Sequence, residues 1–175
     1  MLPRCSDIKR DVPISKINEG VAFCKRNIVD YIKDARLIIK DGRPYHAVIN
    51  VEFALEEFGK ALLIIEAKQN SPTNKVDING KKKGNFVEFC DHNRKVDRAL
   101  ALIDPTDDYR TIFRMAEKGC FEKGILDEPE INHETRLECS FVEYKNNKWN
   151  LRTSIDEQLL NTFIDHLELE VNKIA

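Results

Sequence analysis

The sequence lacks any apolar run long enough to cross a membrane. Its most apolar stretch, residues 61–67, is short, whereas a membrane-spanning helix needs about 20 predominantly apolar residues. The N-terminal segment MLPRCSDIKRDVP contains no apolar stretch typical of a signal peptide. We therefore expect a cytoplasmic protein with no membrane partner.

The sequence also lacks the short motifs that mark common metal and cofactor sites. Its five cysteines are odd in number and scattered, and no two of them have CxxC spacing. The patterns HxxxH and HExxH, phosphate-binding glycine loops and dinucleotide fingerprints are absent. We therefore expect plain thiols in a reducing compartment, and neither a metal nor a cofactor.

Composition and charge favour one globular domain with a heavily charged surface. The chain of 175 residues is 42% hydrophobic and 33% charged, and its net charge is only -2. This balance argues against disorder and permits a sizeable core. Because the net charge is so small, nucleic-acid binding would need a local basic patch. We expect residues 1–13 to form a loose arm and residues 14–175 to form a single domain.

Two long helices are predicted at the centre of this domain. From Ile14 to Asp41, apolar residues recur at alternating steps of three and four, which is a heptad-like seam on one helix. Gly42 suits the left-handed conformation that ends a helix. Pro44 suits the first turn of the next helix, which runs to about Lys68. The short connection predicts an antiparallel helical hairpin.

Three further helices and a small β-hairpin complete the predicted fold. Residues 69–84 are a polar loop rich in asparagine and glycine. Helices are expected at about 85–103 and 108–118. An alternating pattern at about 136–152 predicts the hairpin, and a capping box at Ser154 begins the last helix. The fold class is therefore mainly α, a bundle of about five helices with a hairpin before the last helix.

Three polar residues on the second helix are candidates for a functional site. Glu57 is predicted to be mostly buried among apolar neighbours, where a carboxylate needs a partner or a proton. Glu56 and Lys60 lie on a more exposed arc and can form an i, i+4 ion pair. For Glu57, a structural salt bridge to another helix and a functional role both remain open.

The segment DHNRK on the third predicted helix carries the next candidates. His92 and Lys95 are three residues apart and share a helix face. Near a buried glutamate, they could serve as a general acid or base and as an electrophile in phosphodiester cleavage. A hydrogen-bonded network that joins two helices is the other interpretation of the same residues.

One strong basic run, Lys81-Lys82-Lys83, lies at the end of the polar loop. Together with Arg94, these lysines are the candidate contacts for nucleic-acid phosphates. A solvated loop without a ligand is the alternative interpretation, because charged runs in polar loops are usually exposed to water.

The segment YHAVINVEFALEEFGKALLI resembles the signature helix of the AbiV family of bacterial anti-phage abortive-infection proteins. In that family, a helix of the type A-x-x-L/F-A-x-E-E-x-G-K-A precedes a later helix that bears H-x-x-K. The matching residues in this chain are Ala54, Glu56, Glu57, Gly59, Lys60, Ala61, His92 and Lys95. The segment CSFVEYKNNKWNLRTSI also resembles the hairpin of the family, and the likeness covers roughly residues 14 to 165.

The resemblance implies a HEPN-like helical domain and phage defence through arrested replication or translation. Many HEPN proteins are metal-independent ribonucleases that act as dimers, and their usual mark is Arg, four to six residues, then His. No arginine stands at that distance before His92, where Asn85 is the nearest equivalent. The resemblance also implies a homodimer, and as a partner a phage-encoded activator, a host protein or RNA.

Two functions follow from these residues and from the resemblance. In an endoribonuclease, His92 would move protons, and Lys95 with Lys60 would stabilise the charge on the phosphorane. Glu57 would then orient one of these groups. In a non-catalytic interaction module, a homodimer would bind a phage or host protein through its helical surface and hairpin. The same four residues would then form a structural network.

Overall fold

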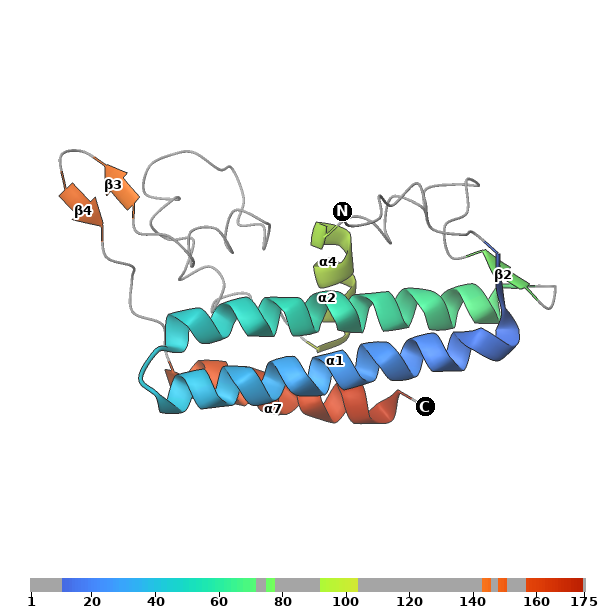
Figure 1. The fold of residues 1–175 in the computed structure, drawn as a ribbon, viewed down its shortest axis with the longest axis horizontal. Helices are drawn as coiled ribbons and strands as arrows, with labels where there is room; N and C mark the ends of the chain where they lie inside the picture. The colour runs from blue at the N-terminus through green and yellow to red at the C-terminus, as the bar shows by residue number, and fades with distance from the viewer. Residues whose placement is uncertain are drawn as a thin grey trace.

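The computed structural model describes residues 11–71, 75–77, 92–103, 143–145, 148–150 and 157–174. Four helices lie within these ranges: α1 (Ile14–Lys40), α2 (Pro44–Gln69), α4 (His92–Ile103) and α7 (Glu157–Lys173). Helices α1, α2 and α7 run along the long axis of the molecule, and α4 crosses α2 steeply (Figure 1). The described part of the chain is therefore mainly helical. None of its helices is both long enough and apolar enough to span a membrane.

Helices α1 and α2 form the predicted antiparallel hairpin. The left-handed Gly42, with a φ of 73°, follows the end of α1, and Pro44 begins α2. The predicted seam on α1 is largely buried. Ile32 and Ile39, which the prediction did not include, are buried as well. The buried residues of the predicted seam are Ile17, Val21, Cys24, Ile28 and Ala35. The hairpin and its apolar seam are thus confirmed.

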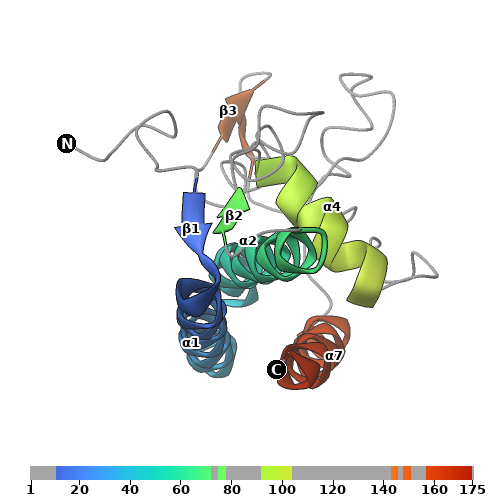
Figure 2. The ribbon, with the colours of Figure 1, turned by 90° about the vertical axis from the view of Figure 1, so that its right-hand side faces the viewer.

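Helix α2 is the central element of the described fold. It contacts α1, α4 and α7, and the view along the bundle shows it between α1 and α4, with α7 below (Figure 2). Phe58 on α2 and Phe163 on α7 are the largest side chains that are fully buried. A helix surrounded in this way needs apolar residues on more than one side, as its sequence predicts.

Residues 11–13 are a strand rather than part of a loose arm. This strand, β1 (Asp11–Pro13), pairs antiparallel with β2 (Lys75–Asp77), and Val12 lies opposite Val76. The prediction was wrong for β1 and also for β2, which lies in the predicted polar loop. Three-residue strands are too short to show an alternating pattern, and their pairing partners are distant in sequence. The β1–β2 pair joins the start of α1 to the chain that follows α2.

A second pair of strands lies in the range where the sequence predicts the hairpin. β3 (Glu143–Lys145) pairs antiparallel with β4 (Lys148–Asn150), and Tyr144 is opposite Trp149. The rest of the range 136–152 lies outside the described residues. The predicted helix at 108–118 and the capping box at Ser154 also lie outside them.

Candidate functional site

A buried ion pair joins α2 to α4. Lys95 Nζ on α4 donates to Glu56 Oε2 on α2 at 3.4 Å, and the two side chains are only 4% and 6% exposed. Burial lowers the pKa of Lys95, because the loss of hydration outweighs the attraction of Glu56. A pair this enclosed costs desolvation free energy that its own attraction offsets only in part. Its clearest effect is to fix the position of α4 on α2.

A glycine sets the distance between the same two helices. A β-carbon at Gly59 would lie 2.0 Å from the carbonyl oxygen of Lys95, far inside van der Waals contact. The backbones of α2 and α4 therefore touch at this point, and only glycine leaves room for the crossing. Gly59 is the glycine of the E-E-x-G-K-A segment. Because it has no side chain, the helix that carries Lys95 can pack directly on the backbone of α2.

A second buried glutamate lies on α2, one turn before Glu56. Glu52 is 2% exposed and precedes Glu56 by four residues, so the two carboxylates share one face of the helix. Sequence reasoning missed Glu52. The signal that could have found it is this i, i+4 pair of acids in an otherwise apolar helix. The face that carries them is buried, so it is not the solvated face that two acids at this spacing usually indicate.

A polar cluster on the other side of α2 faces α1. Lys60 Nζ donates to Glu57 Oε1, and Asn27 Nδ2 on α1 donates to Glu57 Oε2 at 3.4 Å. Burial, together with the nearby Glu57 carboxylate that accepts its hydrogen bond, raises the pKa of the Cys24 thiol to about 12. This cluster is more open than the pair on α4, because the side chains of Lys60 and Glu57 remain 27% and 14% exposed.

The predicted exposure and partner of Glu56 were therefore wrong. Glu56, expected on an exposed arc in a pair with Lys60, is the buried acid that binds Lys95. Glu57, for which a salt bridge to another helix was one open interpretation, pairs with Lys60 on its own helix and accepts a hydrogen bond from Asn27 on α1. Successive helix positions differ by about 100°, so the choice depends on which side of α2 receives α4. Periodicity within α2 alone does not contain that information.

The remaining candidates are placed only in part. His92 begins α4 and Arg94 follows it in the same helix, but their side chains lie outside the described set. The basic run at 81–83 is also outside it. Of the four catalytic candidates, the structure brings Lys60 and Glu57 near Lys95, since the charges of both act on the pKa of Lys95. The described residues contain no group of three or more side chains suited to hold a metal ion.

The crossing of α2 and α4 joins the two sequence segments that carry the family resemblance. A mainly helical domain is consistent with a HEPN-like fold. A family model of HEPN domains, described as AbiV, matches residues 16–167, which is most of the chain. The protein therefore belongs to the AbiV family. This membership suggests a role in abortive infection, which is a defence against phage. Neither the curated proteins nor the solved structures contain a significant match.

Proposed function

We propose that this protein is a bacterial abortive-infection factor that arrests phage replication or translation by binding a phage-encoded or host protein. The observation that carries this proposal is the closed environment of Lys95. A phosphodiester needs direct access to the cation that stabilises its transition state, whereas Lys95 is 4% exposed and is already paired with Glu56. In this position, Lys95 serves to hold α4 on α2.

A second candidate function, RNA cleavage, is favoured by one observation. The ammonium of Lys60 lies beside Glu57, and its side chain keeps 27% of its surface exposed. A lysine of this kind can bind a phosphate group, and His92 begins the neighbouring helix, one turn before Lys95. In this alternative, Lys60 would stabilise the phosphorane charge and His92 would move the proton.

Infection and RNA integrity should be measured together to separate the two functions. We expect cells that express the wild type to resist phage while total RNA stays intact, and Lys60→Met to retain protection. The matched control is Lys16→Met, since Lys16 is also paired with an acid three residues away and is 64% exposed. RNA cleavage by the purified protein that Lys60→Met or His92→Ala abolishes would overturn the binding proposal and establish the nuclease.

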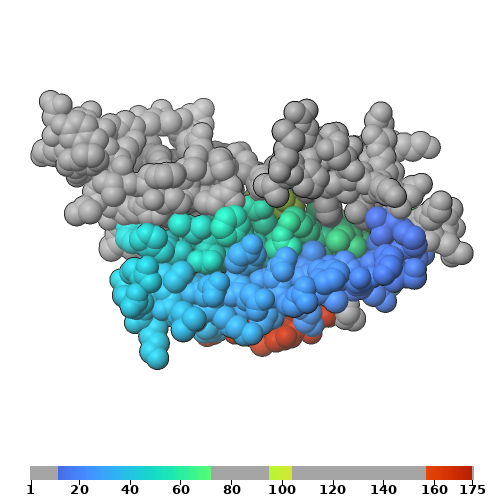
Figure 3. Space-filling view, viewed as in Figure 1, coloured from blue at the N-terminus to red at the C-terminus, as the bar shows by residue number. Residues whose placement is uncertain are grey.

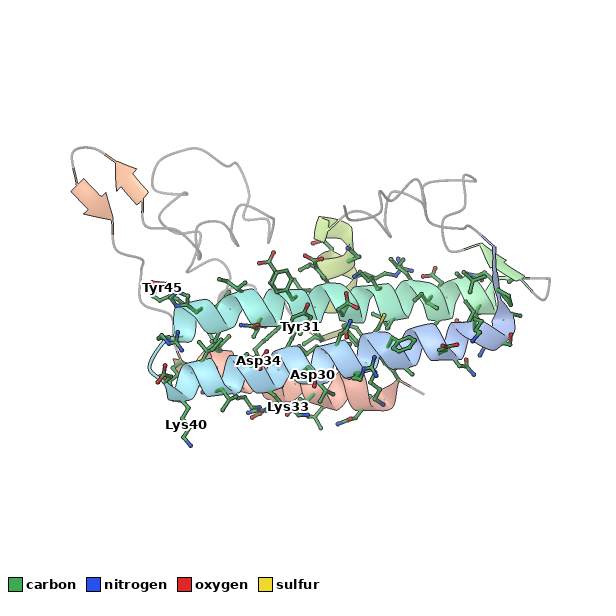
Figure 4. All side chains as sticks on the ribbon, viewed as in Figure 1. Asp30, Tyr31, Lys33, Asp34, Lys40 and Tyr45 are labelled. Atoms are coloured by element: carbon green, nitrogen blue, oxygen red, sulfur yellow. The ribbon has the colours of Figure 1, made fainter. Side chains whose placement is uncertain are left out.

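The outer face of α1 supports a homodimer as the functional unit. Opposite the buried seam runs a solvent-facing stripe (Phe23, Arg26, Asp30, Asp34 and Leu37), and its two large apolar residues are 48% and 65% exposed. Figure 3 shows α1 along the whole length of this side of the described structure, and Figure 4 labels Asp30 and Asp34 on it. We propose that this stripe is the interface of the homodimer, on the ground of the pairing of its residues described next.

The stripe is complementary to itself. In an antiparallel pair of α1 helices with a two-fold axis at Asp30, Phe23 would lie opposite the partner subunit's Leu37. Arg26 would lie opposite the partner subunit's Asp34. Each contact would occur twice, as a two-fold interface requires. Only the two Asp30 carboxylates would meet a like charge, and Lys33, 3.8 Å from Asp30, lies close enough to reduce that repulsion.

A charge swap tests this face. Arg26→Asp should place two acids together and shift the protein from dimer to monomer in analytical ultracentrifugation. The double variant Arg26→Asp with Asp34→Arg should restore the dimer, because the pair is then reversed rather than lost. If the single variant sediments like the wild type, α1 is not the dimer face.

A further inference from the structure

An apolar groove opens at the end of the bundle opposite the α1–α2 turn. Its volume is about 490 Å³, and residues of all four described helices line it. The apolar part of the lining consists of Ile17, Val21, Leu62, Ile65, Leu102 and Ile174. At the rim, Lys68 on α2 and Lys173 on α7 supply positive charge, and Glu170 supplies the one carboxylate of the lining. Leu102 is 49% exposed, so part of the apolar surface faces solvent directly.

The groove exists because α7 is shorter than the hairpin on which it packs. Helix α7 has 17 residues, whereas α1 and α2 have 27 and 26. Along the bundle, α7 ends before the first turns of α1 and the last turns of α2 (Figure 1), and Figure 2 looks onto this end. The α1–α2 hairpin thus extends beyond the end of α7, and the apolar side chains on this extension are not covered by α7.

Helix α7 itself indicates what kind of segment this surface accepts. It buries an apolar face that includes Phe163 and Leu167 against the hairpin. Two of its acidic residues are held by a cation on α1, since Arg36 Nη2 donates to Asp165 Oδ1 at 2.7 Å and to Glu168 Oε2 at 2.6 Å. The hairpin therefore binds an amphipathic helix whose apolar face is flanked by carboxylates.

The rim of the groove also carries cations, but its lining contains only one acid, Glu170. Lys68 Nζ donates to the neutral Asn18 Oδ1 at 2.9 Å, and among the described residues no carboxylate pairs with it. Lys173 is partly neutralised by Glu170. An approaching segment with carboxylates beside its apolar residues would therefore find an available cation at Lys68.

We propose that this groove binds a short amphipathic helix with acidic flanks, presented by a partner protein and lying in line with α7. The mode is that of a helix in an apolar groove, with anchors at i, i+3 or i+4 and i+7. This inference rests on the proposed function, because it names the chemistry of the partner that a binding module for phage defence would capture. The dimer face on α1 is not part of the groove.

The test uses a labelled synthetic peptide with the sequence of α7, residues 157–173, as a probe of the required chemistry. Fluorescence anisotropy with the purified full chain should show saturable binding. Leu102→Glu should weaken the affinity about tenfold, because a charge replaces an apolar contact. Lys68→Glu should weaken it by about three- to tenfold through loss of the charge pair. Leu169→Glu is the matched control, since Leu169 is a helical leucine with 59% exposure and does not line the groove.

Each outcome decides the proposal. Binding that falls with Leu102→Glu and Lys68→Glu but not with Leu169→Glu supports it. No saturable binding, or equal losses in all three variants, overturns it, as does a peptide with its four acids changed to lysine that binds equally well. Dodecanoate binding without peptide binding would also overturn it and assign the groove to a small amphipathic anion. These binding measurements need no phage. If the wild-type protein failed to protect cells from phage, that result would therefore count against the proposed function alone.

Discussion

The two interfaces of α2 are built in different ways. Towards α1, apolar side chains meet along a seam of many similar contacts, from Ile17 to Ile39. Towards α4, the helices meet at one point, where Gly59 admits the backbone of Lys95 and a buried ion pair fixes the position. A seam spreads its stability over many residues, so the loss of one methyl group costs little. A crossing concentrates its stability at one point, so a single added or removed side-chain group there affects the whole contact between α2 and α4.

The largest effect is expected from breaking the ion pair at the crossing. Lys95→Met leaves Glu56 buried without its cation, and this should lower the free energy of unfolding by about 3–5 kcal/mol. Urea denaturation, monitored by circular dichroism, measures the change. The double variant Lys95→Met with Glu56→Met should recover most of the loss, because neither charge is then buried. A double variant as unstable as the single one would show that the pair itself, and not the orphaned charge, matters.

Filling the crossing point should have the next largest effect. Gly59→Ala places a methyl group 2.0 Å from the Lys95 carbonyl oxygen and should destabilise the fold by about 1–3 kcal/mol. The matched control is Gly20→Ala on the seam helix, where the nearest side-chain atom would be 3.8 Å away. This change should stabilise the fold by about 0.5–1 kcal/mol through helix propensity. Equal effects at both glycines would contradict the close approach of α4.

The thiol beside Glu57 should make stability depend on pH. In the folded protein, the pKa of Cys24 is raised from 9.0 to about 12. The neutral thiol therefore contributes stability that is fully present below pH 9 and is lost as the pH rises towards 12. Between pH 7 and pH 10, the free energy of unfolding of the wild type should fall by about 1.4 kcal/mol more than that of Cys24→Ala. The reason is that pH 10 lies one unit above the pKa of the thiol in the unfolded chain. Urea titrations at the two pH values measure this difference, and parallel losses would exclude it.

The smallest of these effects is expected in the middle of the seam. Ile28 is fully buried, yet Ile28→Val removes only one methyl group and should cost about 0.5–1.5 kcal/mol. The same urea titration applies. A loss as large as that of Lys95→Met would mean that the seam is no more tolerant than the crossing, and the distinction between the two interfaces would fail.

The hairpin was predictable from sequence because its signals are local. The spacing of apolar residues on α1, the turn at Gly42 and the proline that begins α2 all act within a few residues of the chain. The candidate site was predictable only in its composition. Glu56, Glu57, Lys60 and Lys95 were all singled out, but Glu56 was assigned to the wrong partner.

What the sequence by itself determined is therefore the set of helices at the centre of this protein and the residues that carry its family resemblance. The tertiary structure alone decided which carboxylate is sealed with Lys95, which one faces Cys24, and where α7 ends on the hairpin. The physical reason is that helical periodicity assigns residues to faces of one helix, whereas the neighbour of each face is set by the packing of distant segments. At Gly59 this packing depends on the absence of a single side chain, which gains its meaning only when α4 is in place.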